Sequence, residues 1–284
     1  MTGFVGQILF VVWRESVEAL LVIGVLNAWL AHQADRVVAT TGRRYLWLGV
    51  AAGGVLAVAL GAVLMTLGDS LSEEGQGYFQ AGMVLVAAAL ILQMVFWMRR
   101  HGRTLKRELE SGAQRSAETA NWWGLAVLAM LAVAREGSET VVFLYGILAA
   151  SGGVGDTAVL VGAIIVGFTL AVFTYWLLQV GGRVLSWRLF FRATEIMLLL
   201  LAAALVMSGV DHLVSLGVVP QLGAAVWDTS FLLDDTGVFG GLFAALTGYR
   251  ARPDVTTLLV YALYWGLVLA ALNRQRLRPA VQRA

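Results

Sequence analysis

The sequence predicts an all-α, polytopic membrane protein with seven transmembrane helices, and composition and apolar run length carry this prediction. The 284 residues are 59% hydrophobic and only 13% charged, with a mean hydropathy of +0.79. A soluble domain carries about 25% charged residues, roughly twice as many. The apolar runs each approach the ~20 residues that a helix needs to cross a ~30 Å hydrocarbon core. The fold class is therefore a bundle of membrane-spanning helices.

The expected helices divide the chain into two halves, an outward-facing segment and a last helix. The first half (1–98) and the second half (122–216) have three apolar runs each, and together with the final run these lie at 4–31, 45–68, 78–98, 122–150, 158–181, 194–216 and 255–273. Segment 217–254 contains GVFGGLFAALTGY, which is too short to span and is expected to be interfacial or re-entrant. No cationic segment precedes the first run, which favours a retained helix over a cleaved signal peptide. We expect a single transmembrane domain over 1–284.

The distribution of basic residues predicts the orientation of the chain. Of the 20 Lys and Arg residues, 16 lie in alternate connections, namely 32–44, 99–121, 182–193 and the tail after 273. The intervening connections, 69–77, 151–156 and 217–254, are acidic or neutral. Because short cytoplasmic loops carry an excess of Lys and Arg, the N-terminus is expected outside and the C-terminus inside. The chain has no cysteine, which excludes disulfides and thiolate metal sites.

A charged motif, R-E-x-x-E, interrupts two of the apolar runs. It occurs in VWRESVEAL (12–20) and again in VAREGSETVVFLYG (133–146), so that its charged residues are Arg14, Glu15, Glu18, Arg135, Glu136 and Glu139. On a helix, residues three or four apart share a face, so each Arg reaches the second Glu of its own motif. The copies lie in the first and fourth runs, which would cross the membrane in opposite directions. They therefore predict an inverted repeat of 1–98 and 122–216, with the motifs meeting near the midplane.

The energetic cost of these charges argues for a shared interior site. One ionised residue at a helix centre costs roughly 2.5–3.5 kcal/mol on insertion scales, so six facing lipid would cost on the order of 15 kcal/mol. Four carboxylates against two guanidiniums leave two excess negative charges. An excess of buried oxygen ligands suits a hard cation such as Fe(III), Mn, Mg or Ca, and it disfavours Cu(I) or tetrahedral zinc. Structural Arg–Glu pairing between helices is the alternative interpretation.

The paired motifs resemble those of the high-affinity iron permease family, the oxidase-dependent iron transporters of fungi and bacteria. The run WDTSFLLDDTGVFGGLFAALTGYRARPD (227–254) is similar to that of the bacterial members. The resemblance implies iron-coordinating carboxylates at Glu15, Glu18, Glu136 and Glu139, with Arg14 and Arg135 as the motif arginines. This chain has Gln80 at the opening of the third helix, where many relatives have Glu.

The resemblance implies a permease that moves iron across the cytoplasmic (inner) membrane of a bacterium. Iron is then the transported substrate, with no prosthetic group, and periplasmic iron-oxidising or iron-delivering proteins of cupredoxin-like or peroxidase-like type are the expected partners. The alternatives are a transporter of another hard divalent cation, Mn or Mg, and a non-transporting membrane assembly subunit. The sequence lacks H-E-x-x-H, G-x-S-x-G and a His pair suited to haem, so we expect no enzyme.

The remaining candidates lie near the ends of the expected helices. Asp228, Asp234 and Asp235 could capture cations at the outer mouth, but Asp228 before Thr-Ser is also typical of an N-cap and DDTG of a turn. Glu195 is expected to pair with Arg192 or to act as an exit ligand. His212 is expected to snorkel or to cap the end of its helix.

Overall fold

The structure, a computed structural model, describes residues 2–33, 35–101, 105–118, 121–151, 157–180 and 187–276. Asp156 and parts of the basic connections predicted for 99–121 and 182–193 lie outside these residues, as does the end of the tail. Within the described ranges the chain forms α-helices and no β-strand, which confirms the all-α prediction. The helices are α1 (Thr2–Ala31), α2 (Arg36–Ser70), α3 (Glu73–His101), α4 (Leu105–Glu118), α5 (Trp122–Ala150), α6 (Thr157–Val180), α7 (Trp187–Ser215), α8 (Val238–Thr247) and α9 (Val255–Arg276).

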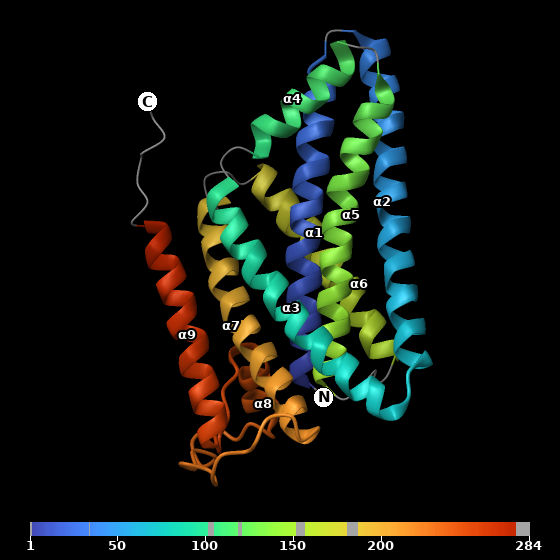
Figure 1. The fold of residues 1–284 in the computed structure, drawn as a ribbon. Coiled ribbons are helices and arrows are strands. Elements are labelled where there is room, and N and C mark those ends of the chain that lie inside the picture. The colour runs from blue at the N-terminus through green and yellow to red at the C-terminus, as the bar shows by residue number, and fades with distance from the viewer. Residues whose placement is uncertain are drawn as a thin grey trace.

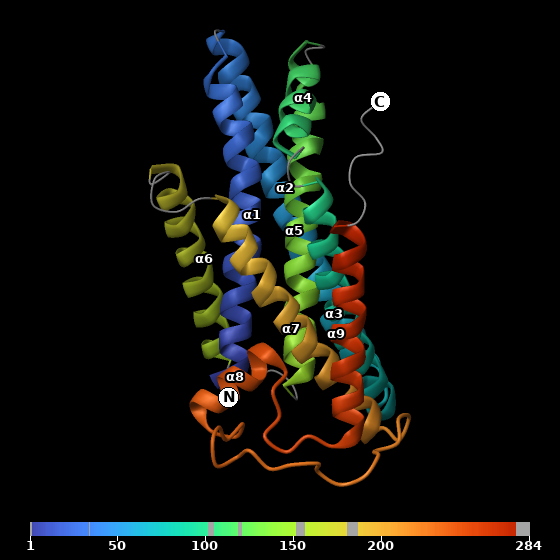
Figure 2. The same ribbon diagram turned by 90° about the vertical axis from the view of Figure 1, so that its left-hand side faces the viewer.

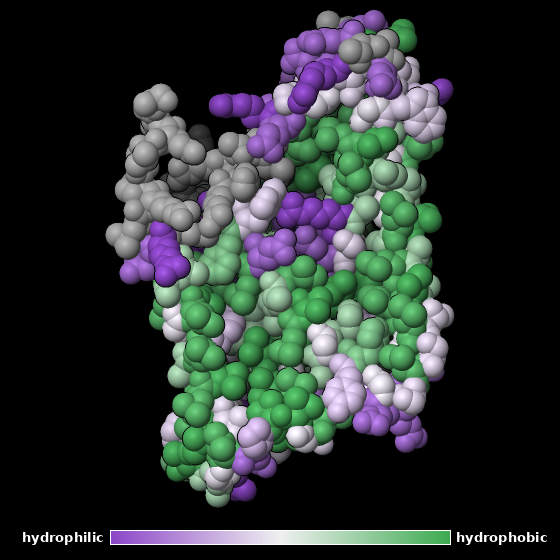
Figure 3. Space-filling model, in the orientation of Figure 1, coloured by the Kyte–Doolittle hydropathy of each residue, from purple (hydrophilic) through white to green (hydrophobic). Residues whose placement is uncertain are grey.

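Five of the described helices are long and apolar enough to cross a membrane, namely α2, α3, α6, α7 and α9. The flank of the molecule is mainly hydrophobic, with one hydrophilic patch partway along it, and further hydrophilic side chains gather at the two ends (Figure 3). This surface is the one expected of a multi-pass membrane protein. The helices α1 and α5, with 30 and 29 residues, are as long as the others but carry the two R-E-x-x-E motifs.

The motif helices α1 and α5 lie at the centre of the bundle and run in opposite directions (Figure 1). Each packs against the second helix of the other half: α2 lies along α5, and α6 lies along α1 (Figures 1 and 2). The third helices of the two halves, α3 and α7, pack against each other, and α9 contacts α7 at the edge. This arrangement places both charged motifs between apolar helices, with Arg135 of the second motif partly exposed.

Small residues bring α2 close to α5. A Cβ atom at Gly53 would lie 2.8 Å from the backbone oxygen of Met130, and one at Gly49 would overlap the backbone oxygen of Ala126. Small residues at such interfaces let helix backbones approach closely, as in G-x-x-x-G contacts. The α2 glycines therefore dock the second helix of one half against α5 of the other.

The helix α4 is an element that the hydropathy pattern missed. It lies in segment 99–121, which we expected to be only a basic connection, and it buries Leu109 and Ala113 against the neighbouring helices. Residues at i and i+4 share a helical face, so two apolar side chains suffice to dock a polar 14-residue helix. The search for apolar runs could not detect it, because most of its surface is polar.

The short apolar stretch in segment 217–254 forms α8, which ends at Gly248 in the left-handed conformation (φ 75°). A helix commonly ends on such a glycine because a Cβ atom is disfavoured there. The helix packs against α1 and α7 near the N-terminus of the chain (Figure 2), and the side chain of Gln7 donates a hydrogen bond to the Ala245 carbonyl. The segment thus covers the end of α1 rather than crossing the bundle.

Candidate metal-ion site

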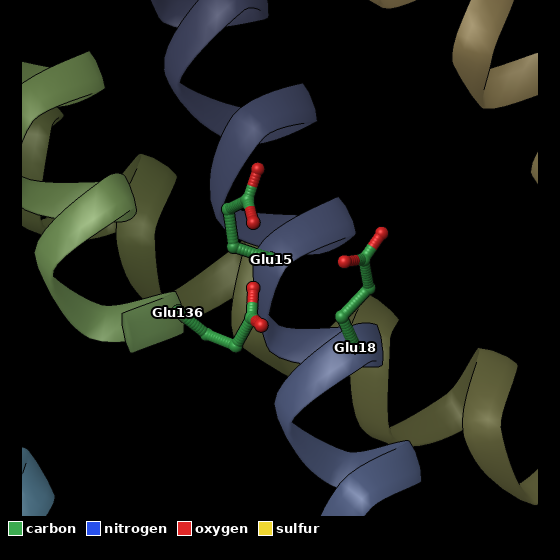
Figure 4. A group of neighbouring side chains, drawn as sticks. All are labelled: Glu15, Glu18 and Glu136. Carbon is green, nitrogen blue, oxygen red and sulfur yellow. The ribbon is translucent and has the colours of Figure 1, made fainter. Parts of the chain in front are cut away.

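Three of the four motif glutamates converge between α1 and α5. Glu15, Glu18 and Glu136 each offer one carboxylate oxygen, and these oxygens lie within 4.8 Å of one another. Figure 4 shows Glu15 and Glu18 on α1 and Glu136 reaching toward them from the neighbouring α5. The ligand atoms therefore come from two antiparallel helices, so that a bound ion would bridge the two halves of the chain.

The convergent carboxylates are shielded from solvent. Glu15 is 1% and Glu136 is 8% exposed. One oxygen of each, Oε2, accepts no hydrogen bond from the described residues, and the same holds for Oε2 of Glu139. A buried oxygen without a partner carries a desolvation cost that a cation would relieve. These atoms therefore have the chemistry of cation ligands.

The arginine of the first motif pairs with both of its glutamates. Nη1 of Arg14 lies 2.7 Å from Oε1 of Glu15, and Nη2 pairs with Oε1 of Glu18 four residues along. The same guanidinium donates to two thioether sulfurs of α3, those of Met94 and of Met98, with 3.0 Å between Nη2 and the Met98 sulfur. Arg14 itself is 1% exposed. Arg14 and Glu15 of the first motif are thus enclosed by protein, and the Glu18 side chain is 12% exposed.

The arginine of the second motif has a different environment. Nε of Arg135 lies 3.0 Å from Oε1 of Glu139 but 3.9 Å from Oε1 of Glu136. Its guanidinium carbon lies 4.0 Å from the centre of the Trp97 ring, which is a cation–π contact. The Arg135 side chain is 38% exposed. Glu139 is therefore held by its own arginine, outside the group of three close carboxylates.

Comparison with known proteins matches this chain to a family. The profile of the iron permease FTR1 family matches residues 5–275. The chain belongs to this family. The ferrous iron permease EfeU of Escherichia coli O6:H1 (strain CFT073) is 28% identical over 261 residues, which are 89% of this chain and 90% of that protein. EfeU of Yersinia pestis is 26% identical over 256 residues, covering 89% and 88% of the two chains. No solved structure matches this chain.

Family membership assigns the general activity. The chain is a multi-pass membrane transporter of the iron permease family and not an enzyme, as the sequence predicted. Both EfeU proteins align over almost their whole length, so the resemblance is not confined to the charged motifs.

Asp228, in segment 217–254 of this permease, is engaged in a local turn. Its Oδ1 accepts hydrogen bonds from the backbone N (2.9 Å) and the hydroxyl (2.6 Å) of Ser230, and its Oδ2 lies 3.0 Å from Nε of Arg252. The Ser230 hydrogen bonds, with help from Arg252, lower the pKa of Asp228 to about 2. This geometry is a local turn and not a helix N-cap, because the next helix, α8, begins only at Val238; ion capture stays a prediction.

The other two outer aspartates also accept local hydrogen bonds. Oδ1 of Asp234 accepts from the backbone N (2.9 Å) and the hydroxyl (2.7 Å) of Thr236. Oδ2 of Asp235 accepts from the backbone N of Ala251 at 3.0 Å. The three aspartates order segment 217–254 beside α8 and lie outside the carboxylate group between α1 and α5.

Two other predicted residues have partners that the structure identifies. Glu195 on α7 forms an ion pair with Arg99 of α3, so the predicted pairing with Arg192 is wrong. The sequence could not show this contact because it joins residues 96 positions apart. Nδ1 of His212 lies 2.8 Å from the Ser208 carbonyl, in its own helix, as expected for a residue near a helix end.

The sequence analysis missed the contribution of α3. Met94, Trp97 and Met98 contact the motif arginines, but none of them is charged. Their only sequence signal is the spacing of i, i+3 and i+4, which is also typical of an ordinary buried helix face. Charge cost identifies Arg and Glu within an apolar run, but it says nothing about neutral neighbours.

Proposed function

We propose that this chain imports ferrous iron across the cytoplasmic membrane through a site built from its two R-E-x-x-E motifs. The observation that carries the proposal is the group of buried oxygens of Glu15, Glu18 and Glu136, within 4.8 Å of one another and supplied by two antiparallel helices. Carboxylate oxygens are ligands for hard and borderline divalent cations. Family membership supports iron as the cargo.

Charge balance favours Fe(II) over Fe(III). Four ionised carboxylates and two guanidiniums carry a net charge of −2, which a divalent ion neutralises and a trivalent ion exceeds by one. Because an uncompensated charge inside a membrane is costly, the site as built prefers the divalent ion. The EfeU relatives, which are named ferrous iron permeases, support the same choice.

We further propose that α1 and α5 span the membrane together with the five apolar helices, giving seven spans with the N-terminus outside. The central position of α1 and α5 supports this, because a helix surrounded by apolar spans has to share their environment. The end of α1, the start of α2 and α4 lie at one end of the molecule and α8 lies at the other, as alternating basic loops require (Figure 1). The reciprocal packing of α2 on α5 and of α6 on α1 supports an inverted repeat of α1–α3 and α5–α7.

The cupredoxin-like or peroxidase-like periplasmic partners stay part of this proposal. A transporter of Mn or Mg is the second candidate, because the same carboxylates would accept either ion. A membrane assembly subunit is disfavoured by the buried oxygens without partners, since a purely structural cluster gains nothing from them.

The test is uptake of radioactive Fe(II), kept reduced by ascorbate, into bacteria that lack their own iron importers. Cells that express this chain should accumulate iron, and cells that express the Glu18→Gln protein at equal membrane level should not. A hundredfold excess of Mg or Mn should compete weakly. Equal uptake by the two proteins would contradict the site, and full competition by Mn or Mg would replace iron with that ion as the cargo.

A further inference from the structure

One face of α3 contacts the arginines of both motifs, although these arginines belong to α1 and α5. The sulfurs of Met94 and Met98 accept from the Arg14 guanidinium, and the Trp97 ring lies 4.0 Å from the Arg135 guanidinium carbon. Residues at i, i+3 and i+4 form one helical face. A single helix of the first half therefore holds the cationic groups of both halves.

The chemistry of this face suits guanidinium groups and leaves the charge of the site unchanged. A thioether sulfur is a weak neutral acceptor, and an indole ring attracts a cation through its face. In the present structure each guanidinium divides its contacts between motif carboxylates and α3. An ion bound to the same carboxylates competes with the guanidiniums for their negative charge and so weakens those contacts. The guanidiniums must nevertheless stay, because the charge balance with a divalent ion requires both.

We propose that Met94, Trp97 and Met98 form an arginine-holding face that keeps both guanidiniums in place while the ion occupies the carboxylates. This inference rests on the proposed iron site. The three are positioning residues, because they act on the ion through Arg14 and Arg135. By offering each guanidinium a second partner, the face lowers the cost of releasing the carboxylates and so raises the affinity of the site for the ion.

Removal of the sulfurs should therefore strengthen the competition between arginine and ion. Arg14 is almost completely buried, so without Met94 and Met98 its remaining described partners are Glu15 and Glu18. A Met→Leu exchange keeps size and apolar character and usually costs little stability. A Met→Gln exchange instead supplies an amide oxygen as an acceptor of similar reach. These two exchanges separate the acceptor role from packing.

The experiment measures Fe(II) uptake against Fe(II) concentration, at equal membrane level, in the cells described above. In the Met94→Leu/Met98→Leu protein the half-saturating concentration should rise about threefold to tenfold, the range that corresponds to an ordinary hydrogen bond, because a thioether is a weak acceptor. Maximal uptake should stay within about twofold of the parent. Met94→Leu/Met98→Gln should recover much of the affinity. Met207→Leu, at a buried methionine of α7, is the packing control and should behave like the parent.

The second arginine supplies an independent arm. Trp97→Leu should raise the half-saturating concentration, whereas Trp97→Phe keeps an aromatic face for Arg135 and should raise it less. Parental half-saturation in both the double Leu protein and Trp97→Leu would overturn the holding face while the proposed function stands. An equal rise in Met207→Leu would also overturn it. Absence of saturable uptake in the parent would instead refute the proposed function.

Discussion

The two R-E-x-x-E motifs share a pattern but not an environment. Arg14 of the first motif is 1% exposed and bonds both glutamates of its motif. The side chain of Arg135 is 38% exposed, and this arginine bonds mainly Glu139 while it stacks on Trp97. An identical pattern on two helices therefore does not make the two halves of the site equivalent.

The difference follows from what surrounds each helix. The α1 motif lies against α6 and against the methionines of α3, which leave Arg14 no route to solvent. The α5 motif lies along the glycine face of α2, and its arginine is 38% exposed beside Trp97 of α3. The arginine of the α1 half is thus enclosed, and that of the α5 half is partly exposed.

The largest expected effect comes from the carboxylates. Glu15→Gln, Glu18→Gln and Glu136→Gln each remove one negative charge from the group of three, and Fe(II) uptake should fall at least about tenfold in each, because a lost ionic ligand costs more than ~1.4 kcal/mol. Glu139→Gln should also impair uptake, but least of the four, because Glu139 lies outside that group. Uptake at equal membrane level is the measurement. Near-normal uptake by Glu18→Gln or Glu139→Gln would count decisively against a ligand role.

Replacing the motif arginines should reduce the folding free energy by different amounts in the two halves of the site. Arg14→Ala leaves Glu15 and Glu18 buried without their partner, which should cost ~3–5 kcal/mol of folding free energy. Arg135→Ala should cost only ~1 kcal/mol, because solvent screens its partly exposed pair. Thermal unfolding of the ion-free proteins in detergent is the measurement. Arg14→Lys keeps the charge but loses the planar guanidinium. The Arg14→Lys protein should therefore fold but transport Fe(II) poorly.

Equal losses of folding free energy in Arg14→Ala and Arg135→Ala would contradict the distinction between the enclosed arginine and the partly exposed one. An Arg14→Ala protein that folds and transports like the parent would show that the enclosed arginine is incidental to the site.

The sequence predicted that the two motifs would meet because buried charge is expensive, and three of their glutamates do converge, whereas their role as iron ligands stays a prediction. Arg14 and Glu15 lie within an apolar run, where exposing their charges to lipid would be costly. Because a second copy of the motif lies in another run, the arrangement of lowest cost is one in which the two copies are buried against each other. The same argument predicted that Glu136 would face α1, and the structure places its oxygen within 4.8 Å of oxygens from that helix. The free-energy cost of burying charge thus allowed the repeated motif to predict a contact between α1 and α5.

The sequence could not predict features that carry no such cost. The helix α4 is amphipathic and mainly polar, so it contains no apolar run that would predict it. Met94 and Met98 are ordinary apolar residues in an apolar helix until Arg14 is placed beside them. The Glu195–Arg99 pair depends on how α7 packs against α3, which no local pattern contains.

The smallest expected effect extends the comparison from buried to exposed carboxylates. Asp234→Asn/Asp235→Asn removes two outer charges, but the Asn side-chain oxygen can still accept the backbone hydrogen bonds from Thr236 and Ala251. If these aspartates only concentrate cations at the outer end, the half-saturating Fe(II) concentration should rise about twofold at low salt with maximal uptake unchanged. The rise should vanish at high ionic strength, because exposed charges are screened there.

Asp228 supplies the pH control for that experiment. Because its pKa is lowered to about 2, its carboxylate stays charged at pH 5 as at pH 7, and the turn that it stabilises should weaken only as the pH falls toward 2. Asp228 should thus contribute the same charge at pH 5 and pH 7, so a change in the effect of the double Asn exchange between these pH values would not come from Asp228. Loss of the double Asn protein from the membrane, with unchanged half-saturation, would identify Asp234 and Asp235 as structural caps. In that case the exposed aspartates would only stabilise the fold of segment 217–254. Only the carboxylates between α1 and α5 would then bind the ion.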